Sequence, residues 1–345
     1  MRRTVLLPPG PGNPRNSEGD FIRLNDGRIM FIYTHFTGGG DDHAKAHLAA
    51  RFSEDQGLSW TAEDIVVIPN EGDMNIMSVS LLRLSSGEIA LFYLRKNSLS
   101  DCRPLMRIST DEAKTWSNPT VCITDEMGYY VVNNDRVVQL ERGRLVIPAS
   151  QHAQVDGKWI EGVAMCYLSD DNGKTWRRSK STLDKASDGK KIDFQEPGVV
   201  ELKDGRLMMF CRTREGCQYI SFSSDSGETW SPPDRSNIIS PLSPATIERI
   251  PSNGNLLLAW NDHSDIPENL RGKRTPFCVA ISKDEGKTWE KVKVLENNPD
   301  GWYCYTAMDF VDNRVLLGHC AGNRVQGAGL AVTQITSFEV AWLYK

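Results

Sequence analysis

The amino-acid sequence predicts an all-β chain, and three observations carry this prediction. An apolar run, a turn and a second apolar run recur as a unit six times. A second phrase, Ser-x-Asp-x-Gly-x-Ser/Thr-Trp, follows five of these units. No long stretch repeats its apolar residues with the period of a helix. Each phrase predicts a hairpin, so every unit has four strands, and six units predict a six-bladed β-propeller with four-stranded antiparallel blades.

The first phrase marks the inner hairpin of each predicted blade. Turn residues such as Asn25, Asp26 and Gly27 separate two apolar runs, which is the pattern of a strand, a tight turn and a strand. The last unit lacks the second phrase and is followed by two apolar segments, so we expect its blade to mix strands from both chain ends, closing the ring and protecting its edges. The whole chain, 1–345, is then one domain. The six copies are 21–31, 81–91, 137–147, 199–209, 247–257 and 308–317.

The second phrase predicts a clamped turn between the outer strands. Ser and Asp side chains can bind backbone N–H groups one or two residues on, glycine accepts positive φ, and Trp anchors the next strand. Ala113 stands at the glycine position of the second copy, which predicts a slightly different turn there. We assign the aspartates of this phrase no catalytic role. The serines that begin the five copies are Ser53, Ser109, Ser169, Ser223 and Ser282.

Composition excludes several classes of protein. The net charge is −5 and no run of five Lys or Arg occurs, which argues against a nucleic-acid partner. No apolar stretch approaches the roughly 20 residues that span a bilayer. The segment 1–9 is too weakly apolar for a signal peptide, which predicts either an intracellular protein or a secreted or periplasmic one whose leader was removed. The sequence does not predict the oligomeric state.

The sequence also predicts no metal and no cofactor. The eight cysteines lack the spacing of metal ligands, and several lie in apolar runs, so we expect buried free thiols rather than disulfides or metal ligands. No His/Asp cluster shows ligand spacing either.

Polar residues precede the first strand of each predicted blade. In a propeller these strands line the axis, so their first ends should meet at one mouth. A pocket with convergent polar groups is a default active-site hypothesis, and the alternative is a solvated funnel without chemistry. The segments are 17–19, 77–79, 133–135, 195–197, 243–245 and 303–305.

The second phrase resembles the Asp-box, or BNR repeat, of the sialidase (neuraminidase) superfamily, and the resemblance covers essentially the whole chain. The segment 196–212 looks like the sialidase segment with a catalytic Glu and, 16 residues later, a carboxylate-binding Arg, here Glu196 and Arg212. Arg274, eight residues before Ser282, matches a further carboxylate-binding Arg. Alternatively, Glu196 and Arg212 form a structural ion pair, and Arg274 belongs to a solvated basic loop.

The resemblance implies two more catalytic residues. Asp42, 11 residues before Ser53, stands where the family has its acid/base, after a glycine-rich loop that could fold over a bound sugar. Asp41 and His43 are credible substitutes. Tyr305 stands where the family has its nucleophile, with Tyr303 as the alternative.

The implied activity is hydrolysis of a terminal acidic sugar, sialic acid or a related 2-keto sugar acid, from a glycoconjugate. The residue types fit this chemistry. The planar fork of arginine binds a carboxylate in two places. A neutral Tyr is not repelled by the substrate carboxylate, and a nearby Glu can take its proton. An Asp can protonate the leaving oxygen and then activate water.

The chain also departs from the family. The position of the first family Arg is Ser17, followed by Glu18, so Arg15 is the candidate substitute. The region 317–322 lacks the Glu that braces this Arg in the family. These departures leave open a different sugar, recognised by Asn134 and its neighbours 135 and 136 or by His152. They also leave open elimination in place of hydrolysis, and a carbohydrate-binding propeller without catalysis.

Overall fold

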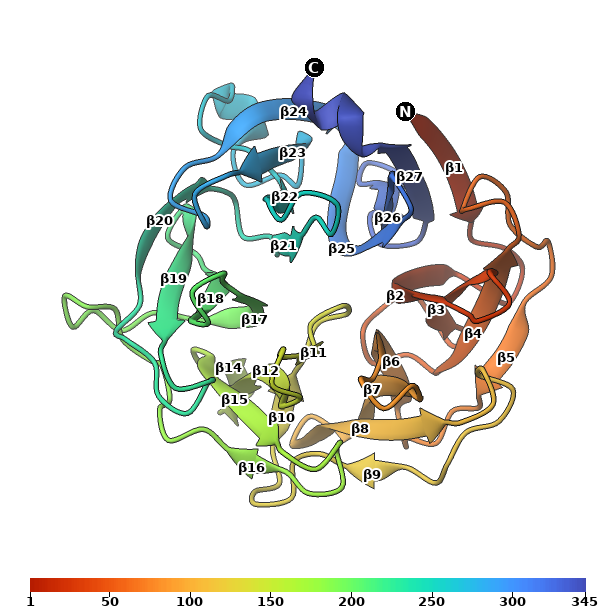
Figure 1. The fold of residues 1–345 in the computed structure, drawn as a ribbon, viewed down its shortest axis with the longest axis horizontal. Helices are drawn as coiled ribbons and strands as arrows, with labels where there is room; N and C mark the ends of the chain where they lie inside the picture. The colour runs from red at the N-terminus through yellow and green to blue at the C-terminus, as the bar shows by residue number, and fades with distance from the viewer.

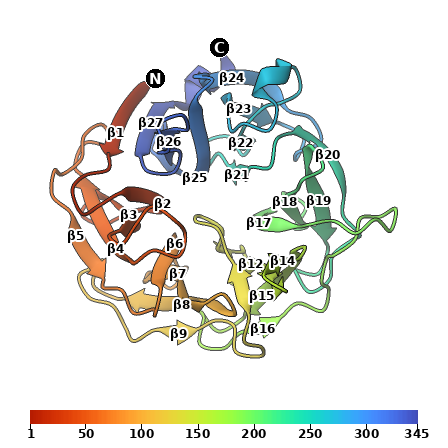
Figure 2. The same cartoon turned by 180° about the vertical axis from the view of Figure 1, so that it is seen from behind.

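The computed structural model describes residues 1–345 and is built almost entirely from β-strands, as the sequence predicts. The sheets stand around a central axis (Figures 1 and 2). Two short 3-10 helices, η1 (Glu268–Leu270) and η2 (Val340–Tyr344), are the helical elements. None of the helices has the length and apolar character that a membrane span requires.

Four sheets have four antiparallel strands each. The first holds β2 (Arg15–Arg23), β3 (Ile29–Phe36), β4 (Ala46–Ser53) and β5 (Ile65–Ile68). The second holds β17 (Gln195–Glu201), β18 (Leu207–Arg212), β19 (Cys217–Ser223) and β20 (Asp234–Ile239). The third holds β21 (Thr246–Arg249), β22 (Leu256–Trp260), β23 (Phe277–Ser282) and β24 (Glu290–Glu296). The fourth holds β25 (Gly301–Val311), β26 (Arg314–Asn323), β27 (Thr333–Glu339) and β1 (Arg2–Leu7), so strands from both chain ends share it.

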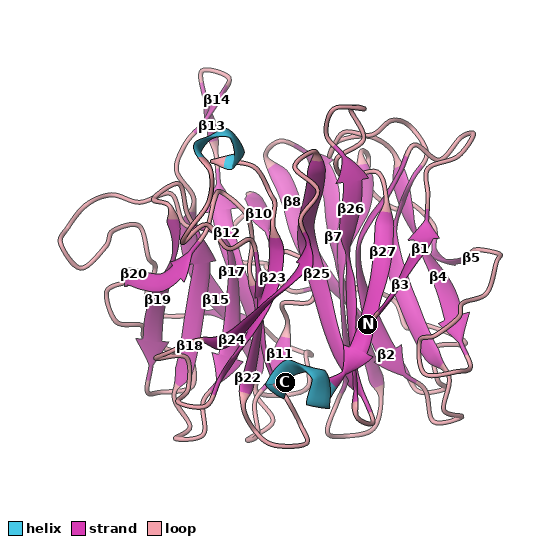
Figure 3. Cartoon of the chain, turned by 90° about the horizontal axis from the view of Figure 1, so that it is seen from above, coloured by secondary structure: helices cyan, strands magenta, loops and turns pink.

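The second and third predicted blades form one nine-stranded sheet, which differs from the six separate sheets that the sequence predicts. A single parallel bridge between Tyr129 and Cys102 joins the two halves. A small hairpin of β13 (Gln154–Val155) and β14 (Lys158–Trp159) projects beyond one face (Figure 3). The nine strands are β6 (Asn75–Arg83), β7 (Ile89–Ser98), β8 (Asp101–Ser109), β9 (Thr120–Val121), β10 (Tyr129–Val131), β11 (Val138–Gln139), β12 (Leu145–His152), β15 (Val163–Ser169) and β16 (Arg177–Arg178).

The five clamped turns share one set of hydrogen bonds. In the fourth copy, the Asp225 carboxylate accepts bonds from Ser223 Oγ (2.8 Å), Thr229 N (2.9 Å) and Thr229 Oγ1 (2.6 Å). Ala113 keeps the same bond to its serine, 2.9 Å from Ser109 Oγ, at φ 62°, whereas the glycines of the other copies lie at 81–90°. The difference predicted for this copy is therefore confined to the backbone angle.

A bulge interrupts four of the innermost strands at the same place. The register of β2, β6, β17 and β25 shifts between Ser17 and Asp20, Met77 and Ser80, Gln195 and Gly198, and Cys304 and Ala307. A bulge bends its strand and redirects a side chain. One residue of each bulge has positive φ, which is uncommon outside glycine and is a recognised sign of a functional site. These four bulge residues are Glu18 (55°), Ser78 (61°), Glu196 (44°) and Tyr305 (54°).

Apolar side chains fill the spaces between neighbouring sheets. Phe210 of β18, for example, packs with Leu258 and Trp260 of β22. All eight cysteines are buried free thiols, in agreement with the sequence prediction.

Candidate functional site

The four bulge residues line one cavity of about 110 Å³. Asp42, from the loop after β3, and Lys96, from β7, complete its polar wall. The cavity thus contains three carboxylates from separate parts of the chain, namely Glu18, Asp42 and Glu196. It lies at the end of the axis where β2, β17 and β25 begin, which is where the sequence predicts the site.

Tyr305, Glu196 and Arg212 form one hydrogen-bonded group. Tyr305 Oη donates to Glu196 Oε1 at 3.3 Å, and Arg212 Nη1 donates to the same oxygen at 2.8 Å. Burial and the adjacent Glu196 charge raise the pKa of Tyr305. The phenol is therefore protonated at neutral pH and needs a base to become a nucleophile. Glu196 Oε2 is buried and has no partner, so this oxygen is free to accept a hydrogen bond.

Arg274 lies beside this group with free donors. Its side chain is buried, and neither Nε nor Nη1 has a hydrogen-bond partner. Its guanidinium stacks 5.0 Å from the centre of the Trp302 ring and 5.2 Å from that of Tyr305. Arg212 Nε is likewise unpartnered. Buried donors without partners are costly, so these two arginines are prepared to receive an anion.

Arg15 pairs with Asp42 instead. Its Nη1 donates to Asp42 Oδ1 at 2.5 Å and to the Gly40 carbonyl at 3.3 Å. Burial alone would raise the pKa of Asp42, but the Arg15 charge outweighs it and holds the pKa below its ordinary value. Asp42 is therefore ionised here, and a role as a proton donor requires its contact with Arg15 to loosen.

The backbone of Asp42 is fixed from the neighbouring strands. Its carbonyl accepts hydrogen bonds from Lys96 Nζ at 2.6 Å and Asn75 Nδ2 at 3.0 Å. Lys96 is 2% exposed and stands over the Tyr129 ring. No sequence pattern indicates a role for Lys96, because a single lysine after an apolar run is not distinctive.

Glu18 is the second residue of the site for which the sequence patterns predict no role. It accepts hydrogen bonds from Arg15 Nη2 at 2.7 Å and from Ser78 Oγ, and it is 5% exposed. Burial raises its pKa, and the Arg15 charge opposes this. The available signal was its place in the segment 17–19, at the predicted mouth.

The alternative residues lie elsewhere. Tyr303 is 6% exposed and stacks on Phe277, with ring centres 6.3 Å apart, in the apolar core. Asp41 is exposed and accepts a hydrogen bond from the backbone of His43. His152 Nε2 lies 3.2 Å from Ser150 Oγ at the end of β12. None of these three side chains lines the cavity.

Asn134 lies beneath the cavity, in a segment that crosses the axis. Its Nδ2 donates to the carbonyls of Gly19 (2.8 Å) and Tyr305 (3.2 Å), and its side chain is fully buried. The next residues bind other sheets, since Asp135 N donates to Val79 O and Arg136 Nη2 to Ala245 O. We name 133–136 the axial segment. Contact of Asn134 with a substrate stays a prediction.

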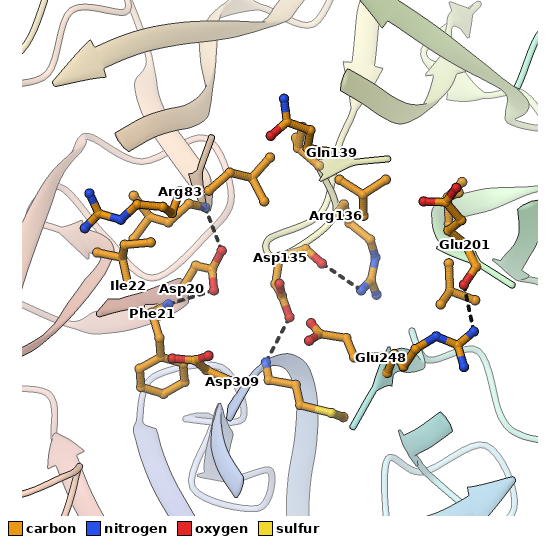
Figure 4. A pocket seen from close by; sticks show the side chains of 18 of the residues that line it. Asp20, Phe21, Ile22, Arg83, Asp135, Arg136, Gln139, Glu201, Glu248 and Asp309 are labelled. Carbon is orange, nitrogen blue, oxygen red and sulfur yellow. Dashed lines mark hydrogen bonds between the residues drawn. The ribbon is translucent and has the colours of Figure 1, made fainter. Parts of the chain in front are cut away.

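A second cavity, of about 920 Å³, is lined by Asp135 and Arg136 of the axial segment (Figure 4), whereas Asn133 of that segment lines the first cavity. Asp20, Asp135, Glu248 and Asp309 point toward its centre. Burial raises the pKa of Asp135 and of Asp309 to about 6, and it raises the pKa of the other two carboxyls well above the ordinary value. No group of His, Cys, Asp and Glu side chains has the arrangement of a metal site.

Comparison with known proteins gives one family match and several relatives. The model of the BNR repeat-like domain matches residues 35–315. A sialidase from Micromonospora viridifaciens is 26% identical over 327 residues, which are 84% of this chain and 46% of that protein. The chain thus spans about half the length of this curated relative.

Two solved structures share the fold. A protein of unknown function from Dyadobacter fermentans has a TM-score of 0.77 at 18% identity, covering 98% of this chain and 99% of that one. A sialidase from Trypanosoma rangeli has a TM-score of 0.74 at 15% identity, covering 99% of this chain and 60% of that one. The all-β architecture therefore matches that of sialidases. The chain belongs to the BNR repeat-like domain family, within the sialidase superfamily.

Proposed function

We propose that this chain is a sialidase-like exo-glycosidase that hydrolyses a terminal sugar acid from a glycoconjugate. The observation that carries the proposal is the hydrogen-bonded group of Tyr305, Glu196 and Arg212, with the free donors of Arg274 beside it. We further propose that residues 1–345 form one six-bladed propeller domain, in which each half of the nine-stranded sheet counts as a blade.

In this mechanism Tyr305 attacks the anomeric carbon while Glu196 takes the phenolic proton. The Tyr–Glu hydrogen bond of 3.3 Å sets the path of that proton. Arg212 and Arg274 bind the substrate carboxylate through donors that have no partner in the protein. A neutral nucleophile suits this site because a carboxylate nucleophile would repel the bound acid.

Asp42 gives a proton to the leaving oxygen and later takes one from water. Its loop is held through its carbonyl, whereas its carboxylate is paired with Arg15. Substrate binding must displace this pair, which removes the Arg15 charge and leaves burial to raise the pKa of Asp42, so that the carboxyl can hold the proton that it donates.

The test is hydrolysis of an aryl sialoside, extended to aryl glycosides of related 2-keto sugar acids. We expect Tyr305→Phe to abolish turnover and Glu196→Gln to lower kcat by about 10²–10⁴-fold. The matched control is Tyr303→Phe, which removes a hydroxyl from the nearby core and should leave kcat within about twofold.

Inactivity of the wild type on every acidic glycoside would contradict the proposal. Two other results would favour a different function for this chain. An unsaturated sugar among the products indicates elimination, and tight binding of an intact glycan that Asp42→Asn leaves unchanged indicates a binding protein.

A further inference from the structure

We propose that Glu18 is a specificity-determining residue whose carboxylate accepts a hydrogen bond from a substrate hydroxyl. The substrate class is then a sugar acid with its carboxylate at Arg212 and Arg274 and uncharged hydroxyl donors at the opposite wall. This inference rests on the proposed function, because it concerns the same site.

The first argument is positional. Glu18 and Glu196 occupy the same place in the bulges of β2 and β17, and both have positive φ. Glu18 pairs with Arg15, the first residue of β2, and accepts a hydrogen bond from the Ser78 hydroxyl. Glu196 pairs with Arg212, the last residue of β18, and accepts a hydrogen bond from the Tyr305 hydroxyl. Two groups of like composition are therefore present, Arg15–Glu18–Ser78 and Arg212–Glu196–Tyr305, and the carboxylate and the hydroxyl residue of each line the same cavity.

The second argument is that Arg15 has almost no donor left for a ligand. A guanidinium has five N–H groups. Nε binds Ser17 at 3.0 Å, Nη1 binds Gly40 and Asp42, and Nη2 binds Glu18. One N–H remains, whereas Arg274 has two nitrogens without partners. The substrate carboxylate is therefore expected to bind at Arg212 and Arg274 rather than at Arg15.

The third argument concerns charge. Glu18 and Asp42 share the wall of the cavity, and the cations beside them, Arg15 and Lys96, already donate to acceptors of the protein. An acidic group of the substrate placed there would therefore meet two carboxylates. Each oxygen of Glu18 accepts one hydrogen bond from the protein and can accept a second. A substrate hydroxyl can donate this further hydrogen bond to Glu18, whereas a second carboxylate or a sulfate has no proton to donate and is repelled.

The experiment measures binding of the 2,3-unsaturated analogue of sialic acid by calorimetry. Glu18→Gln keeps the size of the side chain and removes the charged acceptor, and we expect the Kd to rise about tenfold. The methyl ester of the same probe tests where the carboxylate of the probe binds. Because we place that carboxylate at Arg212 and Arg274, the ratio of ester Kd to acid Kd should be the same in Glu18→Gln and the wild type.

The opposite result has a clear physical meaning. If Glu18 serves only to neutralise Arg15, Glu18→Gln releases that guanidinium toward the probe, and binding becomes tighter or does not change. The double variant Arg15→Met/Glu18→Gln removes both charges of this ion pair. No unpaired charge is then left buried, so a change in binding does not arise from misfolding. Binding to this variant should be weaker than to Arg15→Met alone, and equal binding overturns the inference.

The two proposals fail in different ways. A wild type that binds the probe, together with a Glu18→Gln variant that binds it equally well or better, overturns only the role of Glu18. A wild type that neither binds the probe nor hydrolyses acidic glycosides contradicts the proposed function, and the inference falls with it.

Discussion

Asn134 should support the fold and hold Tyr305 in place, and replacing it with leucine tests both roles. Its amide nitrogen binds the carbonyls of Gly19 and Tyr305, from two different sheets. Leucine has a similar volume but no donor, so both carbonyls lose a partner inside the protein. The amide oxygen has no partner in the wild type, so its loss removes no hydrogen bond.

The expected cost follows from these two contacts. A buried carbonyl that loses its donor costs about 1–1.5 kcal/mol, which gives about 2–3 kcal/mol for Asn134→Leu. An unfolding entropy of about 2.1 cal/mol/K per residue gives roughly 0.7 kcal/mol/K for the 345 residues. The melting temperature should therefore fall by about 3–4 °C.

The assay combines thermal unfolding with hydrolysis of an aryl sialoside. Asn261 is a matched control, because it is also buried and binds one carbonyl, that of Pro276 at 3.1 Å. Asn261→Leu should lower the melting temperature by about half as much and leave kcat unchanged. Asn134→Leu should also lower kcat, since Tyr305 loses a contact that holds its φ of 54°. A melting temperature within 1 °C of the wild type would refute the reasoning.

Three further predictions concern separate features. Asp225→Ala removes the acceptor of three hydrogen bonds at an exposed turn, so urea unfolding should show a loss of about 1–2 kcal/mol, and a loss below about 0.3 would be incompatible with a clamp. Burial raises the pKa of Asp309 from 3.8 to about 6, so the folded state binds its proton more tightly and stability falls as pH rises from about 4 to about 6. Asp309→Asn should reduce this pH-dependent loss of stability by about 1–3 kcal/mol. A plot of unfolding free energy against pH that matches the wild type would contradict this prediction. Lys96→Met frees the Asp42 carbonyl and should lower kcat on the aryl sialoside about tenfold, whereas an unchanged kcat would show that Asn75 alone suffices.

Local patterns predicted much of the fold. The spacing of Ser223, Asp225 and Gly227 encodes hydrogen bonds within seven residues, so the clamped turns can be read without knowledge of the rest of the chain. The nine-stranded sheet depends on one bridge between Tyr129 and Cys102, 27 positions apart, and no local pattern encodes such a contact.

The candidate site was predictable only in part. The resemblance to the sialidase family implied roles for Glu196, Arg212 and Tyr305, which the structure brings together. The pairing of Arg15 with Asp42 and the buried position of Lys96 arise from contacts between sheets, for which the sequence carries no periodic signal. Positive φ at Glu18 was equally hidden, because the usual sign of that conformation is glycine.

The four bulges have a consequence for how such a site can change. Each of the four strands contributes the residue of its bulge with positive φ to the cavity, from a backbone position that its own hairpin determines. Substitution of Ser78 or Glu18 therefore changes one wall of the cavity and leaves the pairing register of all other strands unchanged. The four positions lie on separate strands but are hydrogen-bonded in pairs, Ser78 with Glu18 and Tyr305 with Glu196. A library that varies each pair together, with Asp42, therefore samples new ligand chemistries on an unchanged scaffold.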